Sequence, residues 1–355
     1  MAISKKKTKK GKGKGIRIGI SLIAVLAFIA AFFVYFIFLS SGTKFNQDEA
    51  IIFINDKNAN QQFVKKEIQK NLHSAHYTTF LALAEWTGYW KNIKTGRYII
   101  KDGMGVFSIF QKLNTGKQDP IKITINKFRT HQQFANFLGK KLEYTSSDFL
   151  QFMDNNDSLS FLGLNKESLF TLIIPNTYEF YWNTKPKAFF SKMNKEANKF
   201  WNEKRLEDLQ QIGISKEEVI TIASIIEEET NDNTEKPTMA SVYLNRLKKG
   251  MPLGADPTIK FAVGDFTIKR VTLKHINSTA TSPYNTYKNK GLPPGPICTP
   301  SIASIDAVLK GEKSDYLYFC AKADFSGSHS FAATAQEHLE NARKYRKALD
   351  SLGIR

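Results

Sequence analysis

Apolar positions divide the chain into one uninterrupted run near its start and many shorter periodic segments after it. The run from Ile18 to Leu39 has no charged side chain, and it is long enough to cross a bilayer as a helix, which needs about 20 apolar residues. We therefore predict an uncleaved transmembrane helix. A cleaved signal peptide is the alternative, since Ser40, Ser41 and Gly42 are small, but its apolar core is usually only about 7–15 residues long.

Positive charge precedes the apolar run. Eight Lys and Arg residues and no acid lie between Met1 and Arg17, and such residues stay on the cytoplasmic side of a membrane. We expect residues 1–17 to form a cytoplasmic basic tail and residues 18–39 to span the membrane once. Everything from about Thr43 onward then lies outside the cytoplasm.

The periodic segments after this run predict a mixture of helices and strands, and 355 residues suffice for two folded domains. The first segments are a strand at 49–54, helices at 60–72 and 80–90, a strand at 98–100 leading into a turn at 101–103, a helix at 106–113 and a strand at 121–125. A helix-rich section follows at 131–201, is interrupted by an aromatic segment at 172–184, and includes an amphipathic helix at 189–209. The aromatic residues at 178–182 could stack on sugars, but alternating aromatics more often belong to a core.

The strongest helical pattern begins at Ser215, where the sequence Ser-Lys-Glu-Glu predicts an N-cap. Val219, Ile222, Ile225 and Ile226 recur at helical spacing, which predicts one strongly buried face. The later elements are a helix at 237–249, a turn at 256–257, an irregular loop at 282–301 rich in Pro, Gly and Asn, a helix at 302–309, a strand at 316–320, a hairpin through Gly327 and a final helix at 335–351.

Three glutamates, Glu227, Glu228 and Glu229, close the central helix. Successive helical residues are rotated by about 100°, so the three carboxylates point in different directions. Glu229 lies nearly in line with Ile222 and is the most surrounded by aliphatic side chains, whereas we expect Glu228 to be solvated. An aliphatic setting disfavours the charged form, so Glu229 is a candidate general acid near neutral pH. The alternative is a surface glutamate without a catalytic role.

Charge and cysteine content narrow the class of protein only a little. The net charge of +18 suits nucleic acid, anionic lipid or an anionic polymer, but no Cys/His module, RNA-binding aromatic signature or glycine-rich phosphate loop favours nucleic acid. With six scattered histidines and no ligand spacing, we predict no metal ion and no cofactor. Cys298 and Cys320 lie in the exported part, where a disulfide is permitted, and the sequence leaves open whether they are bonded.

Several motifs in one order resemble a known family. They are IASIIEEET at 222–230, ASVYLNRLKKGMPLGADPT at 240–258, SPYNTY at 282–287, GLPPGPI at 291–297, YLYF at 316–319 and SHSF at 328–331. With GRYIIKDGM at 96–104 and IPNTYEF at 174–180, they are similar to the YceG/MltG-like endolytic murein transglycosylases of bacterial inner membranes. The resemblance covers nearly the whole chain after the apolar run.

The resemblance implies an α+β fold with a single transmembrane helix and two further parts. These are a small LysM-like α+β subdomain at 45–126 and a larger mixed α/β catalytic domain at 127–351, with linker helices at 127–213 and a catalytic core at 214–351. The catalytic glutamate would lie on a buried helix. The location would be the bacterial inner membrane, and the partners would be peptidoglycan glycan strands and the synthases of elongation or division.

The resemblance also implies the reaction. Such enzymes cut glycan strands between MurNAc and GlcNAc and leave a 1,6-anhydro-MurNAc end, using one carboxyl first as acid and then as base. The catalytic glutamate of the family matches Glu229, and Glu227 is the reserve candidate. The residues that would line the glycan groove are Asn245, Asp256, Tyr284, Asn285, Tyr287 and His329, although each could equally be a turn or cap residue.

Two other functions compete with this one. A muramidase-type hydrolase would use the same site, with Asp256 assisting a water molecule. A membrane-tethered glycan-binding scaffold would hold wall-synthesis enzymes and use no catalyst at all. A nucleic-acid binder is supported only by charge.

Overall fold

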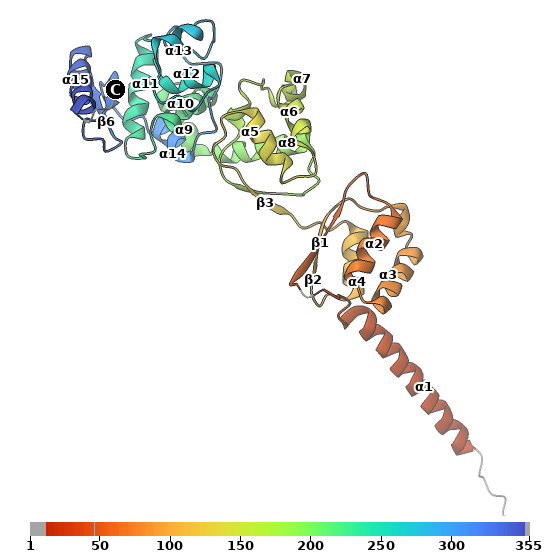
Figure 1. The fold of residues 1–355 in the computed structure, drawn as a ribbon. Coiled ribbons are helices and arrows are strands. Elements are labelled where there is room, and N and C mark those ends of the chain that lie inside the picture. The colour runs from red at the N-terminus through yellow and green to blue at the C-terminus, as the bar shows by residue number, and fades with distance from the viewer. Residues whose placement is uncertain (1–11, 46, 352–355) are drawn as a thin grey trace, which may run out of the picture. The chain divides into compact units, whose positions relative to one another are not determined.

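The computed structural model describes residues 12–45 and 47–351. Most of the predicted basic tail at 1–17 therefore lies outside the described residues. The chain forms two compact units, one of residues 1–121 with 181–183 and the other of residues 122–180 with 184–355. Figure 1 labels their helices and strands.

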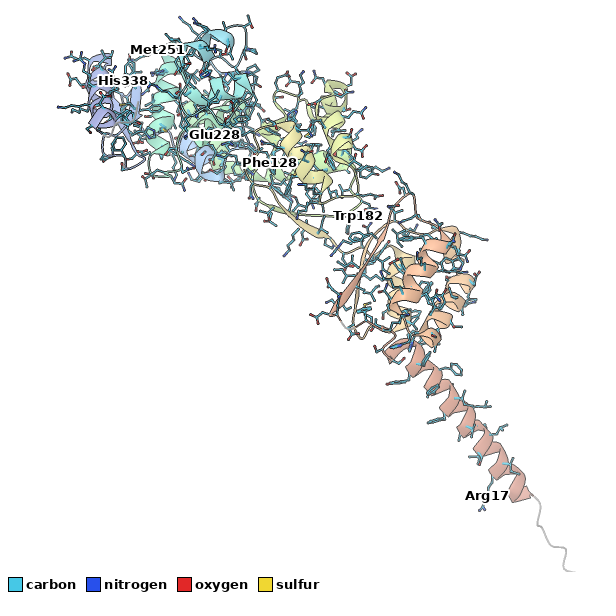
Figure 2. All side chains as sticks on the ribbon, in the orientation of Figure 1. Arg17, Phe128, Trp182, Glu228, Met251 and His338 are labelled. Carbon is cyan, nitrogen blue, oxygen red and sulfur yellow. The ribbon has the colours of Figure 1, made fainter. Side chains whose placement is uncertain are left out.

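The predicted apolar span is a helix. It comprises α1 (Lys12–Val34) and a last π-helical turn, η1 (Tyr35–Leu39). The stretch from Arg17 to Phe38 has a mean hydropathy of 2.8, and its most apolar 18 residues are not buried by the rest of the protein. Figure 2 shows side chains standing free along α1 from Arg17 onward. Its length and composition are consistent with a single-pass membrane anchor.

The smaller unit is built around a two-stranded antiparallel sheet. β1 (Glu49–Ile54) pairs with β2 (Gly96–Lys101), and the helices are α2 (Gln61–Asn71), α3 (Ser74–Trp86), the short η2 (Tyr89–Lys91) and α4 (Val106–Thr115). Alternate strand residues Ile52, Ile54, Tyr98 and Ile100 are buried with apolar residues of these helices. The predicted elements are confirmed, except that the helix expected at 80–90 begins and ends earlier as α3 and is followed by the separate η2.

The first half of the larger unit consists of short helices. They are α5 (His131–Gly139), α6 (Ser146–Met153), α7 (Asn156–Leu159), η3 (Ser160–Leu162), η4 (Leu169–Leu172), α8 (Pro186–Phe200) and α9 (Glu203–Ile212). The strand predicted at 121–125 forms as β3 (Ile121–Thr124) and pairs with β4 (Thr177–Phe180). In β4, Tyr178 and Phe180 are buried, and Phe180 stacks on Phe189 at 4.5 Å. These aromatics belong to the core.

The single helix predicted at 189–209 is wrong. Two helices form instead, because the Asn202 side chain accepts a hydrogen bond from the Arg205 backbone N–H and starts α9 as an N-cap. Trp201, at the break, leaves the helical conformation with ψ of 63°.

The second half of the larger unit surrounds α10 (Lys216–Glu229). Ser215 and Glu218 form the capping box that the sequence predicts at its start. All eight residues from Val219 to Ile226 are buried, so the helix is enclosed on every side rather than on one face. It packs against α11 (Lys236–Lys248), α12 (Asp256–Val263) and α14 (Ile302–Lys310), which Figure 1 shows around it.

Two predictions in this region need correction. Asp256 and Pro257 were expected in a turn, but they start α12, because proline fits the first turn of a helix. A short helix, α13 (Leu273–Ser278), was not foreseen. The irregular loop at 282–301 is confirmed, as are the hairpin of β5 (Tyr318–Ala321) with β6 (His329–Ala332) and the final helix α15 (Ala335–Ser351).

The loop at 282–301 is irregular but firmly held. Its Ile297 N–H donates to Ser224 Oγ of α10 at 3.0 Å, and its Thr299 N–H donates to the Phe128 carbonyl at 2.9 Å. Gly295 is buried so tightly that an added Cβ would collide with the Glu167 carbonyl oxygen. The loop is therefore a fixed wall of the larger unit.

We expect Gly295→Ala to lower the free energy of unfolding of the larger unit by about 1–3 kcal/mol, because a methyl group there must push two backbone segments apart. Thermal unfolding of the purified protein measures the change. Pro294→Ala, at the exposed neighbouring position, is the control and should leave the midpoint unchanged. Equal midpoints for Gly295→Ala and the parent would contradict the close approach.

Candidate active site

The three glutamates that end α10 have three different environments. Glu228 is bound by the Arg129 guanidinium through two parallel hydrogen bonds, Nε to Oε1 and Nη2 to Oε2, both 2.9 Å long. Lys127 Nζ lies 3.4 Å from the same carboxylate, which is only 12% exposed. The prediction that Glu228 is solvated is therefore wrong, because residues almost 100 positions earlier in the chain cover it. Figure 2 labels Glu228 and Phe128, the residue before Arg129.

Glu227 lies at the centre of a polar cluster. Its Oε2 accepts hydrogen bonds from Ser301 Oγ and Ser304 Oγ, each at 2.6 Å, and Lys236 Nζ lies 3.2 Å away with its side chain 4% exposed. Burial alone would raise the pKa of Glu227, but the two serine hydroxyls and the lysine outweigh it, and the pKa is lowered. Glu227 is thus held as a carboxylate that joins α10, α11 and α14.

Glu229 has the properties of a proton donor. Its Oε1 accepts one hydrogen bond, from the Tyr243 hydroxyl of α11 at 2.7 Å. The pKa of Glu229 is raised to about 7: burial is the largest cause and Asp256 adds to it, while Tyr243 and Lys260 oppose the rise. A carboxyl with this pKa is protonated in a large share of molecules at neutral pH, which suits a general acid.

Glu229 lines a pocket of about 650 Å³, within the usual range for ligand sites. The other walls come from α11, the segment before α12, the start of α12, the loop at 282–301, the β5–β6 hairpin and α15. The side chains that line it include Arg246, Asp256, Tyr287, Tyr318, Cys320, His329 and His338. The pocket therefore combines one acid of raised pKa with aromatic, cationic and imidazole groups.

Two residues predicted to line the groove form a hydrogen-bonded pair in the lining of this pocket. The Tyr287 hydroxyl donates to Asp256 Oδ1 at 2.5 Å. Burial, with the hydrogen bond to Asp256, raises the pKa of Tyr287 well above its usual range. Tyr287 is 37% exposed, so the pair remains accessible to a ligand.

His329 also lies in the pocket, and one carboxylate fixes it. Glu235 Oε2 lies 2.9 Å from His329 Nδ1, and Glu235 Oε1 accepts the His329 backbone N–H at 2.7 Å. With Nδ1 occupied in this way, the other ring nitrogen, Nε2, is the atom that can bind a ligand.

Three residues predicted from the sequence lie outside this pocket. Asn245 donates from Nδ2 to the carbonyls of Ser314 and Tyr316. Asn285 is fully buried and organises its own loop through bonds to the Thr279 carbonyl and the Tyr287 N–H. Neither side chain lines the pocket of Glu229, and a contact of either with a glycan stays a prediction. Tyr284 packs on Phe261 at 4.7 Å and lines a different pocket.

Two residues of α11 at this site were not among those predicted from the sequence. Tyr243 is the hydrogen-bond partner of Glu229, and Arg246 donates to the carbonyls of Leu317 and Leu253 at 2.6 and 2.7 Å. Arg246 thereby ties the residue before β5 and the segment before α12 to α11. A signal for Tyr243 existed, because a tyrosine on an apolar helix face needs a partner for its hydroxyl.

The cysteines are not bonded to each other. Cys298 is fully buried beside α10, and Cys320 is partly exposed in the pocket of Glu229. Burial raises the pKa of both thiols. Within residues 12–45 and 47–351, no group of three or more His, Cys, Asp or Glu side chains is arranged to hold a metal ion.

We expect Tyr243→Phe to shift the pH dependence of activity. The Tyr243 hydroxyl stabilises the ionised carboxylate, so its loss should raise the pKa of Glu229 above about 7. A hydrogen bond to a charged group contributes about 1.5–3 kcal/mol, which corresponds to an upward shift of about one to two units. The alkaline limb of kcat/KM against pH measures the shift. An unmoved limb would show that another group controls it.

Comparisons with known proteins agree with the motifs. The family model of the YceG-like family matches residues 54–344. An endolytic murein transglycosylase of Bacillus subtilis is 32% identical over 71% of this chain and 73% of its own length. An endolytic murein transglycosylase of Streptococcus pneumoniae is 25% identical over 90% of this chain, which spans 65% of that relative.

A solved structure shares the fold. The crystal structure of a YceG-like protein from Listeria monocytogenes is similar with a TM-score of 0.53 and 28% identity, over 82% of this chain and 98% of that protein. The family model covers most of the chain and extends across both compact units. The chain therefore belongs to the YceG-like family.

Proposed function

We propose that this chain is an endolytic murein transglycosylase that cuts peptidoglycan glycan strands between MurNAc and GlcNAc and leaves 1,6-anhydro-MurNAc ends. The observation that carries the proposal is Glu229, a carboxyl with its pKa raised to about 7 at the wall of an accessible pocket. Family membership and the names of the relatives support the same activity.

In the first step, protonated Glu229 gives its proton to the glycosidic oxygen. The bond from that oxygen to C1 of MurNAc breaks, and positive charge develops at C1. The Tyr243 hydrogen bond stabilises the carboxylate that remains. General acid catalysis of this kind contributes about 10²–10⁴-fold to a rate.

In the second step, the Glu229 carboxylate takes the proton from the C6 hydroxyl of the same MurNAc. The C6 oxygen then bonds to C1 and closes the anhydro ring. Glu229 ends protonated, ready for the next cycle, and no water enters the product. One carboxyl therefore suffices, whereas a hydrolase usually needs two that flank the bond.

Three other pocket residues are proposed to hold the sugars. Asp256 and Tyr287, already joined by a hydrogen bond, accept and donate to sugar hydroxyl or N-acetyl groups. His329 binds through Nε2 while Glu235 holds its ring. Glu227 is engaged with two serines and Lys236, so we assign it a structural role.

We also propose the topology and partners. The chain is anchored once in the bacterial inner membrane by residues 18–39, with its N-terminus in the cytoplasm and its catalytic unit outside it. The smaller unit is the LysM-like part, and the partners are nascent glycan strands and the peptidoglycan synthases. The apolar helix and the relatives' murein substrate support this arrangement.

Mass spectrometry of the products tests the function. The full chain in detergent is incubated with purified uncrosslinked peptidoglycan strands. Anhydro-MurNAc ends are expected. Reducing MurNAc ends would instead identify a muramidase-type hydrolase, with Asp256 assisting water. Binding of strands without any cleavage would identify a glycan-binding scaffold.

A further inference from the structure

A second pocket lies in the same unit, and the proposed reaction leaves it unused. Its volume is about 420 Å³. Its walls come from the start of α5, from α6, from the segment before η4, from α12 and from the loop at 282–301. The side chains that matter here are Arg129, Lys166, Phe170, Phe261 and Tyr284.

Neighbouring residues on shared elements connect this pocket to that of Glu229. Asp256 at the start of α12 lines the Glu229 pocket, and Phe261 on the same helix lines the second. Five residues of helix advance about 7–8 Å. In the loop at 282–301, Tyr287 lines the Glu229 pocket and Tyr284 lines the second pocket. The two pockets thus share two walls, α12 and the loop at 282–301.

A third connection runs through α10. Glu229 lines the first pocket, while its neighbour Glu228 holds Arg129, which lines the second. The end of α10 is therefore a third element that the surroundings of both pockets share.

The chemistry of the second pocket suits a peptide better than a sugar. Its interior is apolar, with Phe170 buried and Phe261 packed against Tyr284 at 4.7 Å. Its rim carries both signs of charge. Lys166 Nζ, half exposed, lies 3.8 Å from Glu167, a separation that leaves the ammonium available to another anion. Sugar residues are mostly neutral, whereas a short peptide offers methyl groups, a carboxylate and an amine together.

We propose that this pocket binds the peptide stem carried by the MurNAc adjacent to the cleavage site. This inference rests on the proposed function, because it takes peptidoglycan as the ligand. The aromatic walls receive the alanyl methyl groups of the stem, and Lys166 binds a stem carboxylate at the rim. The pocket thereby lets the enzyme distinguish strands that carry stems from strands that do not.

A charge reversal at the rim tests the proposal. The full chain in detergent is assayed on uncrosslinked strands with stems and on the same strands after an amidase has removed them. Lys166→Glu should lower kcat/KM about tenfold on strands with stems, mainly through KM, because repulsion replaces a charge-assisted contact. Its kcat/KM on stripped strands should equal that of the parent.

Lys204→Glu is the matched control, since it makes the same charge change at an exposed position of α9 outside the pocket. It should behave like the parent on both substrates. An equal loss for Lys166→Glu on both substrates, or no loss on either, would overturn the proposal.

A direct titration separates this proposal from the proposed function. Free stem tetrapeptide is added to the parent and to Lys166→Glu, and binding is followed by calorimetry. We expect saturable binding to the parent and at least tenfold weaker binding to the variant. No difference between them would refute the stem site. A parent that binds the tetrapeptide yet makes no anhydro ends would refute the proposed function alone.

Discussion

Glu229→Gln should abolish formation of anhydro-MurNAc ends, with a loss of about three orders of magnitude or more, because one group serves as acid and then as base. The amide has nearly the shape of the carboxyl and can still accept the Tyr243 hydrogen bond, but it neither gives nor takes a proton. Digestion of purified strands followed by mass spectrometry measures the loss. Activity within tenfold of the parent would move the catalytic role to another residue of the pocket.

The same substitution should change stability in a way that depends on pH. The pKa of Glu229 is raised from 4.5 to about 7, so the folded state keeps a proton that the unfolded state has lost. The free energy of unfolding therefore falls as pH rises between these values. Glutamine removes this cost. At pH 8 the free energy of unfolding of Glu229→Gln should therefore exceed that of the parent by on the order of 1–3 kcal/mol.

Thermal unfolding at pH 5 and pH 8 measures this difference. The gap between Glu229→Gln and the parent should shrink at pH 5 to about a quarter of its size at pH 8, because pH 5 lies only about half a unit above the unfolded pKa of 4.5, whereas pH 8 lies above both pKa values. A gap of the same size at both pH values would argue that packing, and not the proton, accounts for it.

Glu227→Gln should be the most destabilising change at the end of α10, with a loss of about 3–5 kcal/mol, because it leaves the buried Lys236 ammonium without its carboxylate. For a unit of this size the unfolding midpoint should fall by about 10 °C. The pKa of Glu227 is lowered, so its contribution is present above the usual pKa of a glutamate and is lost as pH falls below it. Thermal unfolding at pH 7 measures the effect.

A double substitution is the control for Glu227. Adding Lys236→Met to Glu227→Gln removes both charges and should recover most of the lost stability. Replacing both partners of a buried ion pair destabilises a protein less than replacing one partner, which leaves a buried charge unpaired. Glu227→Gln should also keep its cleavage activity at temperatures where it remains folded. Loss of activity without loss of stability would instead make Glu227 the catalytic residue.

Local patterns in the sequence predicted most elements. The capping box at Ser215, the apolar spacing of α10 and the turn at Gly327 depend on neighbours in the chain, and the structure confirms them. The break between α8 and α9 was missed although its signal is local. Asn202 is a good N-cap, but the apolar pattern continues across it and suggests one helix.

The surroundings of the candidate site could be predicted only in part. Helical geometry selected Glu229 as the carboxyl in the most apolar setting, and burial does raise its pKa, while its catalytic role stays a prediction. The environment of the Glu228 side chain depends on its ion pair with Arg129, which lies 99 positions away in the sequence. Asn245 and Asn285 carry the right chemistry for sugars, but tertiary contacts engage their amides with backbone carbonyls. A single sequence does not reveal such distant partners.

The three glutamates at the C-terminal end of α10 restrict insertions and deletions in this helix. Glu227, Glu228 and Glu229 each meet a separate set of partners, and one residue of helix turns a side chain by about 100°. An insertion or deletion of one residue between Ser215 and Glu227 would therefore give each carboxylate its neighbour's surroundings. The fourteen residues of α10 act as a spacer of fixed length, which tolerates exchange of side chains far better than any change in their number.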